Sequence, residues 1–330
     1  MCLVAFAVVY FVLHLPAVED SHWREKLARI DFLGAFCLVV ATFTLLLGLD
    51  RGSNVAWSSP ITIACVITSV PLFIIFVLVE MKWASNPFAP GHIIFERSLI
   101  ASYLCNFFSV AGYMGILFYV PLFFQAVDGV SASEAGLRLI PGIIGSVLGS
   151  IGGGMIMQKT GKFYWVTVIA FILLPFGILL VVLFSGFITN STMGIITGLI
   201  FCGLGGGAGV TTTLIALIAN ADPKDQAIAT ACSYLFRSLG SVIGLSVSST
   251  VVQQSLRTQL REKLSGDQAD TIVDRVRQSL EYINELDPAT RKLVESCYQK
   301  ATNAAFGLTA VLVCGALVSS FYIKEKKLSK

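Results

Sequence analysis

The sequence predicts an all-α membrane protein that crosses the bilayer many times. Eight apolar runs each approach or exceed the about 20 residues that a helix needs to cross a hydrocarbon core of ~30 Å. The 330 residues are 55% hydrophobic and 13% charged, and their mean hydropathy is +0.79. A soluble domain of this size could not bury so much apolar surface. The runs are 32–49, 61–79, 99–124, 135–157, 165–187, 193–219, 226–252 and 301–323.

The chain starts with an apolar stretch that is too short to cross a bilayer. Residues 2–13 are apolar, and the sequence turns polar at His14. No basic segment precedes this stretch and no small-residue cleavage site follows it, so it does not resemble a signal peptide. We interpret residues 1–15 as the remnant of a transmembrane helix whose beginning is missing, which gives about eight full spans and one partial span.

Basic residues are distributed unevenly among the loops between the spans. Successive loops alternate between the two sides of the membrane, and twelve Lys and Arg residues fall on one side. They include Lys159 and Lys162 in the short loop after the fourth run, and the basic tail 324–330. Because cytoplasmic loops carry an excess of Lys and Arg, we predict that this side, with the loop 16–31 and the tail, is cytoplasmic.

One long polar segment, residues 253–300, lies between the last two runs on the opposite side. It carries eight basic and eight acidic residues. Apolar residues recur at helical spacing from Val273 to Ile283, Asp287-Pro288 ends that pattern, and 289–300 predicts a second helix that leads into the last span. We expect a non-cytoplasmic, amphipathic helical hairpin at the membrane surface, with a regulatory or partner-binding role as the alternative.

Small residues repeat at every fourth position in three of the runs. Such spacing lets helix backbones approach closely, which supplies association energy in lipid. Close packing is the simpler interpretation, and sliding or bending of these helices during a conformational cycle is the functional one. The glycines concerned are Gly142, Gly145, Gly149, Gly153, Gly203, Gly207, Gly240 and Gly244.

Arg237 lies eleven residues into the run 226–252, where a charge is costly. It shares a helix face with Gly240 and Gly244, which predicts a buried, hydrogen-bonded arginine at a protein interface. The alternative is that the span starts near Tyr234 and that Arg237 extends to the cytoplasmic phosphates. Arg138 is three residues into its run, and for it we expect such an extension to the interface.

Further polar side chains lie at membrane depth in the run 99–124 and at its end. Asn106 and Tyr113 are seven residues apart and therefore share a helix face, Tyr119 follows, and Gln125 lies at the outer end. These residues are candidates for the lining of a solute pathway, and hydrogen bonding between helices is the alternative.

The sequence lacks residues that several classes of function require. His14, His22 and His92 are isolated and no two cysteines form a CxxC pair, which argues against a metal site, a cofactor or a membrane enzyme. A net charge of +3 gives no reason to expect a nucleic-acid partner.

The apolar runs contain no acidic residues. No Asp or Glu lies within a full apolar run; Asp50 and Glu80, like the other acidic residues near the runs, are at their ends. A proton-coupled carrier normally keeps a carboxylate inside its bundle.

Three stretches of the sequence resemble a known family. They are YVPLFFQAVDGVSASEAG at 119–136, which runs into LIPG at 139–142, the pair QAIATA at 226–231 and FRSLGSVIG at 236–244, and MQKTGKFY at 157–164. They resemble the fourteen-helix drug:proton antiporter branch of the major facilitator superfamily, and within it the fungal vacuolar basic amino-acid transporters and their multidrug-resistance relatives. The resemblance covers almost the whole chain but only the C-terminal portion of the family.

This resemblance implies how the chain is divided and what it does. Residues 16–98 would contain a cytoplasmic loop and two inserted linker helices, and 99–330 would form the C-terminal six-helix half of an incomplete bundle. It implies exchange of protons for a small cationic or amphipathic solute by alternating access, with basic amino acids at the vacuolar membrane favoured. A plasma-membrane multidrug exporter is the alternative, and a truncated, non-transporting assembly partner is an alternative of another class. An N-terminal half of the same protein and the lipid bilayer are the expected partners.

Overall fold

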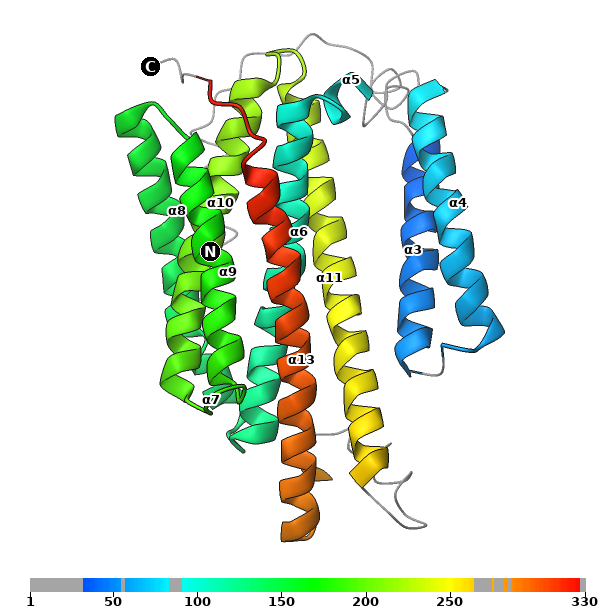
Figure 1. The fold of residues 1–330 in the computed structure, drawn as a ribbon. Coiled ribbons are helices and arrows are strands. Elements are labelled where there is room, and N and C mark those ends of the chain that lie inside the picture. The colour runs from blue at the N-terminus through cyan, green and yellow to red at the C-terminus, as the bar shows by residue number, and fades with distance from the viewer. Residues whose placement is uncertain are drawn as a thin grey trace, which may run out of the picture.

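The computed structural model describes residues 32–54, 57–82, 91–263, 275, 282–283 and 286–326. Its long helices lie side by side in one bundle (Figure 1). Within the described residues, eight helical stretches are long and apolar enough to cross a membrane. They coincide with the eight predicted runs, which confirms an all-helical membrane fold. The expected partial span at 1–15 and the loop at 16–31 lie outside the described residues.

Side-chain caps and prolines fix where several helices begin. Glu96, Ser191 and Asp287 precede α6, α10 and α13, and each accepts a hydrogen bond from a backbone N–H of the first turn. Hydrogen bonds from Thr290 lower the pKa of the exposed Asp287 carboxyl. The described helices are α3 Phe32–Asn54, α4 Pro60–Lys82, α5 Gly91–Ile94, α6 Arg97–Val127, α7 Ala132–Leu137, α8 Ile140–Thr160, α9 Tyr164–Phe184, α10 Thr192–Asn220, α11 Gln226–Lys263 and α13 Pro288–Ser320.

Two helices, α7 and α8, replace the single span that we predicted at 135–157. The chain turns at Arg138 and Leu139, and Pro141 is the second residue of α8. Proline has no N–H to donate, and its ring crowds the carbonyl four residues earlier, here that of Leu137. A continuous helix through this point is therefore unfavourable, and the span breaks one turn before its glycine-rich part.

Other helices extend beyond the predicted runs. α3 continues to Asn54 and α4 to Lys82, so Asp50 and Glu80 lie inside helices and not just beyond them. α11 continues to Lys263 and α13 starts at Pro288, so both ends of the segment 253–300 prolong membrane helices. Leu256, Leu260 and Val294 are buried where α11 and α13 pack together. The described parts of this segment are therefore a projecting helix pair (Figure 1), whereas most of 264–285, which includes the first helix of the expected surface-lying hairpin, lies outside the described residues.

The helices form two packed groups with a separate pair at one edge. α8 and α9 both pack on α10, α11 and α13 both pack on α6, and α9 meets α13 between the groups. α3 and α4 pack on each other, and α3 contacts α11 (Figure 1). The division into two inserted helices and a C-terminal half stays a prediction, and this arrangement is compatible with it.

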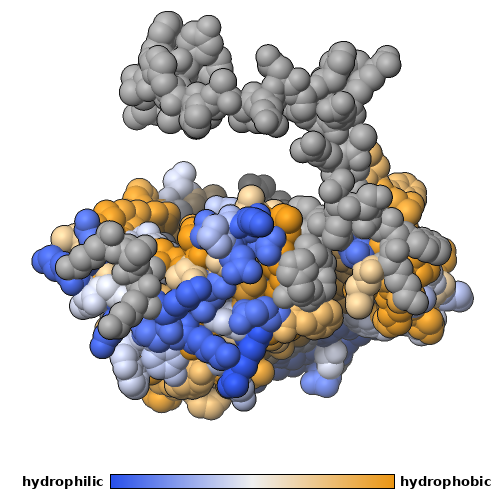
Figure 2. Space-filling view, turned by 90° about the horizontal axis from the view of Figure 1, so that it is seen from above, coloured by the Kyte–Doolittle hydropathy of each residue, from blue (hydrophilic) through white to orange (hydrophobic). Residues whose placement is uncertain are grey.

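Loops that we assigned to one membrane side lie at one end of the bundle. The α8–α9 loop, the α10–α11 loop and the chain after α13 are all at the upper end in Figure 1. Seen from that end, hydrophilic residues gather over the face and hydrophobic ones lie around it (Figure 2). Apolar side chains such as Ile143, Leu148 and Ile169 are exposed on the sides of the bundle, where a bilayer would cover them.

Candidate functional site

A cavity of about 290 Å³ lies between α6, α8, α10 and α11, with Leu174 of α9 at its edge. Lining residues from α6, α8 and α10 lie near the middle of their helices. Ser150 and Gly206 are the central residues of α8 and α10, and Tyr113 is beside the centre of α6. Arg237 is near the centre of the apolar run 226–252. The cavity is therefore at mid-depth in the membrane, where polar side chains are candidates for a functional site.

The cavity combines one positive charge with several hydroxyl groups. Arg237 and the hydroxyl-bearing side chains of Ser109, Tyr113, Ser146 and Ser150 provide the polar part, and no acidic side chain is among its lining residues. Arg237 is half-buried, and its Cζ lies 5.4 Å from the centroid of the Tyr234 ring. Of the two alternatives left open by the sequence, this location favours an arginine inside the bundle.

Asn106 does not line this cavity but joins three of its helices. Its side-chain Nδ2 donates to Ser233 Oγ on α11 at 3.0 Å, and Thr213 Oγ1 on α10 donates to Asn106 Oδ1 at 3.2 Å. All three side chains are buried. Ser233 is one helical turn before Arg237, so this junction fixes the part of α11 that carries the arginine. Of the two roles considered for Asn106, cavity lining and hydrogen bonding between helices, the structure shows the second. Of Asn106 and Tyr113, only Tyr113 lines this cavity.

Tyr119 lines a different, smaller cavity of about 200 Å³ between α3, α6 and α11. Asp50, Ser246 and Ser249 line it as well. No sequence pattern associates Asp50 with Tyr119, because their helices are far apart along the chain. The helix extension beyond residue 49 is what brings this carboxylate to the cavity.

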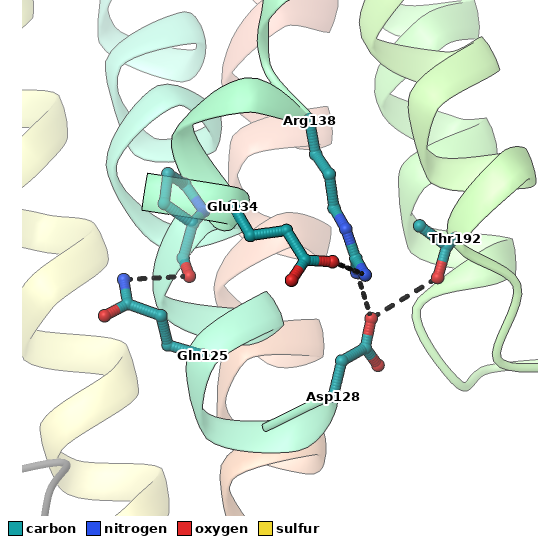
Figure 3. A network of polar contacts seen from close by, with 6 residues as sticks. Gln125, Asp128, Glu134, Arg138 and Thr192 are labelled. Carbon is teal, nitrogen blue, oxygen red and sulfur yellow. Dashed lines mark hydrogen bonds and ion pairs between the residues drawn. The ribbon is translucent and has the colours of Figure 1, made fainter. Parts of the chain in front are cut away.

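Gln125 lines neither of these two cavities. Its side-chain Nε2 donates to the Pro121 carbonyl of its own helix at 3.2 Å (Figure 3). The solute-pathway role that we predicted for Gln125 therefore has no support from its position. A proline breaks the regular hydrogen bonding of a helix, and the amide of Gln125 adds a bond one turn later.

Arg138 is held by two carboxylates and does not simply extend to the interface. Its Nη1 lies 2.8 Å from Asp128 Oδ2, and its Nη2 lies 2.8 Å from Glu134 Oε1 (Figure 3). Thr192 Oγ1 of α10 donates to the same Asp128 oxygen at 3.3 Å. The guanidinium also lies over the Phe124 ring, 5.0 Å from its centroid. This network joins the end of α6 to the break between α7 and α8 and to the start of α10.

The predicted glycine stripes lie where helix backbones meet. A Cβ built on Gly142, Gly145, Gly149 or Gly153 of α8 would meet α10 first, and one built on Gly203 or Gly207 of α10 would meet α8. On α11, Gly240 and Gly244 face the backbone of α6 at Phe107 and Ala111. These positions account for the glycines by close packing. A role in gating stays a prediction.

The basic loop after α8 is tied to the end of the chain by a residue that we did not single out. Lys159 and Lys162 are exposed. Beside them, the Glu325 carboxylate accepts hydrogen bonds from the backbone N–H of Phe163 at 2.9 Å and of Tyr164 at 3.1 Å. A carboxylate at a helix N-terminus satisfies free N–H groups and opposes the positive end of the helix dipole. The first part of the predicted basic tail is therefore docked on α9.

A family model described as Major Facilitator Superfamily matches residues 32–245, which is more than half of the chain. The chain belongs to the major facilitator superfamily. Its fold is also similar to a solved structure, a bacterial homolog of the human lysosomal transporter Spinster in an inward-facing and occupied conformation. That comparison has a TM-score of 0.57 at 14% identity and covers 89% of this chain and 65% of the other.

Curated relatives of this superfamily member come from fungi. The chain is 35% identical to a vacuolar membrane amino acid uptake transporter, fnx2, of Schizosaccharomyces pombe, with 98% of the chain and 56% of that protein aligned. It is 34% identical to the multidrug resistance protein fnx1 of the same yeast, over 94% of the chain and 59% of the relative. Vacuolar basic amino acid transporter 2 of Saccharomyces cerevisiae is 30% identical, over 88% and 63%. The chain thus spans a little over half the length of these relatives.

Proposed function

We propose that this chain is part or all of a secondary active transporter of the fourteen-helix branch, working by alternating access rather than by catalysis. The observation that carries the proposal is the mid-depth cavity between α6, α8, α10 and α11, which contains Arg237. Transporters of this kind bind their solute near the middle of the bilayer. A charged side chain at that depth is retained where it faces a water-filled or solute-filled space.

We further propose that transport is coupled to protons, with a helix carboxylate as the proton carrier. Among the described residues, Glu80 is the one charged side chain that is almost fully buried, with 4% exposed. Asp50 is the second candidate, because it lines the smaller cavity together with Tyr119. Acidic side chains inside a membrane helix bundle are candidates for a proton pathway.

For the solute we propose basic amino acids, moved across the vacuolar membrane. The names of two relatives support this, since one is a vacuolar amino acid uptake transporter and the other a vacuolar basic amino acid transporter. The 34% identity to a multidrug resistance protein favours a second candidate, export of amphipathic compounds at the plasma membrane.

Uptake into vesicles with an acidic interior tests this proposal. With the chain present, labelled L-arginine should accumulate while the proton gradient lasts, and a protonophore should abolish the accumulation. Arg237→Ala should lower uptake roughly 10- to 100-fold, the effect of losing a hydrogen bond to a charged group worth about 1.5–3 kcal/mol. The exposed Lys224 of the α10–α11 loop provides the control, because Lys224→Ala removes one positive charge outside the cavity.

Three other outcomes would count against the proposal or change it. Extrusion of a cationic dye without arginine uptake would support the exporter. No movement of either compound by correctly inserted protein would contradict transport by this chain and support the non-transporting alternative. Equal uptake by the Arg237→Ala variant and the original chain would exclude the cavity as the route.

A further inference from the structure

Arg237 brings a positive charge into the cavity between α6, α8, α10 and α11. Among the described residues it has no acidic partner. The side chains around the cavity supply hydroxyl groups, and no described carboxylate forms an ion pair with Arg237. Arg138 provides the contrast within the same chain, since its guanidinium binds two carboxylates. The potential inside the cavity is therefore positive, and it attracts the negatively charged part of a solute.

The guanidinium group has the shape to bind a carboxylate through both oxygens. Its N–H donors form a planar fork that matches the spacing of the two carboxylate oxygens. The exposed Tyr234 ring, whose centroid is 5.4 Å from the Arg237 Cζ, adds a cation–π contact to the group. The Asn106–Ser233 hydrogen bond at 3.0 Å holds the preceding turn of α11 against α6. Arg237 is thus a charged donor on a fixed part of the wall.

Hydroxyl groups from the facing helices add donors around the same space. Tyr113 of α6 and Ser146 and Ser150 of α8 line the cavity with Arg237. Two further lining hydroxyls are already engaged: Ser150 Oγ is 2.7 Å from Thr211 Oγ1 of α10, and Ser109 Oγ donates to the Asn106 carbonyl at 3.3 Å. Tyr113 and Ser146 are then the hydroxyl donors best placed to complete an anion site with Arg237.

We propose that Arg237, with Tyr113 and Ser146, binds the α-carboxylate of an amino-acid solute. This rests on the proposed function, because it assigns a solute group to the cavity of a transporter. It also refines the expectation of a small cationic or amphipathic solute, with basic amino acids favoured: the described lining residues would recognise the acid end of such a molecule. An amine that lacks the carboxylate meets only a positive charge here, and the site rejects it.

Paired ligands test this proposal by equilibrium binding to the purified chain in detergent. L-Arginine is compared with agmatine and L-lysine with cadaverine, since each pair differs by the carboxylate alone. The amino acid should bind at least tenfold more tightly than its amine. Arg237→Gln should remove this difference, Arg237→Lys should keep part of it, and Lys224→Gln should leave it unchanged. Tyr113→Phe removes one hydroxyl and should reduce the difference by a few-fold without altering the fold.

The possible results separate this proposal from the transport function. Equal affinity for both members of each pair, binding of neither, or an equal loss for both in Arg237→Gln would overturn the carboxylate site. Preference for the amino acid in a chain that shows no flux would support the site and contradict the transport proposal. Flux of arginine together with equal affinity for arginine and agmatine would support the transport proposal and contradict the carboxylate site.

Discussion

At the scale of single residues, Arg138 forms a partly buried ion pair, although a charge near the membrane surface could be solvated by water alone. Its side chain is 21% exposed and its partner Asp128 is 16% exposed, so water screens their ion pair only in part. Asp128 also accepts a hydrogen bond from Thr192 on α10. Removal of the arginine leaves a largely buried carboxylate without its counter-charge, which is costly.

We expect Arg138→Ala to lower the free energy of unfolding by about 1–3 kcal/mol, measured by titration with sodium dodecyl sulfate. Glu134→Gln is the matched control, because Glu134 is 52% exposed and its ion pair links residues four apart on the surface. Such pairs contribute about 0.3–0.5 kcal/mol. If the two variants lose the same amount, the ion pair between Arg138 and Asp128 contributes nothing measurable.

The sequence identified polar residues at membrane depth, but it did not identify most of the residues that they contact. Arg138 meets two residues that are near it in the sequence, and Glu134 could have been proposed as a partner from helical spacing. Asn106 instead meets Thr213 and Ser233, more than a hundred residues away along the chain. Hydropathy gives no register between distant spans, so the choice between cavity lining and interhelical bonding for Asn106 and Tyr113 required the fold.

At the scale of helices, glycine sets how closely α8 and α10 pack. A Cβ on Gly149 would meet the Leu204 carbonyl of α10, whereas a Cβ on Gly152 of the same helix meets nothing within 4 Å. The two glycines differ only in the direction they face. Small-residue spacing predicted this stripe with Gly152 beside it, but not which atoms of α10 the stripe meets.

We expect Gly149→Ala to destabilise the bundle by about 1–3 kcal/mol, because the added methyl group forces two backbones apart. Gly152→Ala should be neutral or stabilise α8 by up to about 1 kcal/mol through better helix propensity. Thermal unfolding in detergent compares the two variants directly. A loss of stability in Gly152→Ala, or none in Gly149→Ala, would show that the stripe does not set this contact.

Helix boundaries were less predictable than the helices themselves. The lengths of the apolar runs predicted eight spans. Within the bilayer such runs form helices, because a helix satisfies its own backbone polar groups. The break at Arg138 depends on Pro141, and the continuation of α11 to Lys263 depends on packing against α13. Hydropathy predicts neither effect, because the break falls within an apolar run and the continuation of α11 falls in a polar segment.

At the scale of the whole molecule, two packed groups of helices surround a cavity at mid-depth. Membership of the major facilitator superfamily explains this arrangement, and the motif at 226–244 that carries the resemblance also carries Arg237. The sequence could not predict that four helices would place Arg237, Tyr113 and three serines together, because that depends on tertiary packing. It also did not predict that Glu325 would connect the end of the chain to α9.

The most direct test of the central claim is the reactivity of a cysteine in the cavity. With the eight native cysteines replaced, Ser146→Cys should react with a small, hydrophilic methanethiosulfonate, and L-arginine should slow the reaction. Ile143→Cys on the same helix is the control: this side chain is 51% exposed on the side of the bundle and should stay unmodified in lipid. Equal reactivity at the two positions, or no protection by L-arginine at Ser146→Cys, would contradict a solute pathway through this cavity.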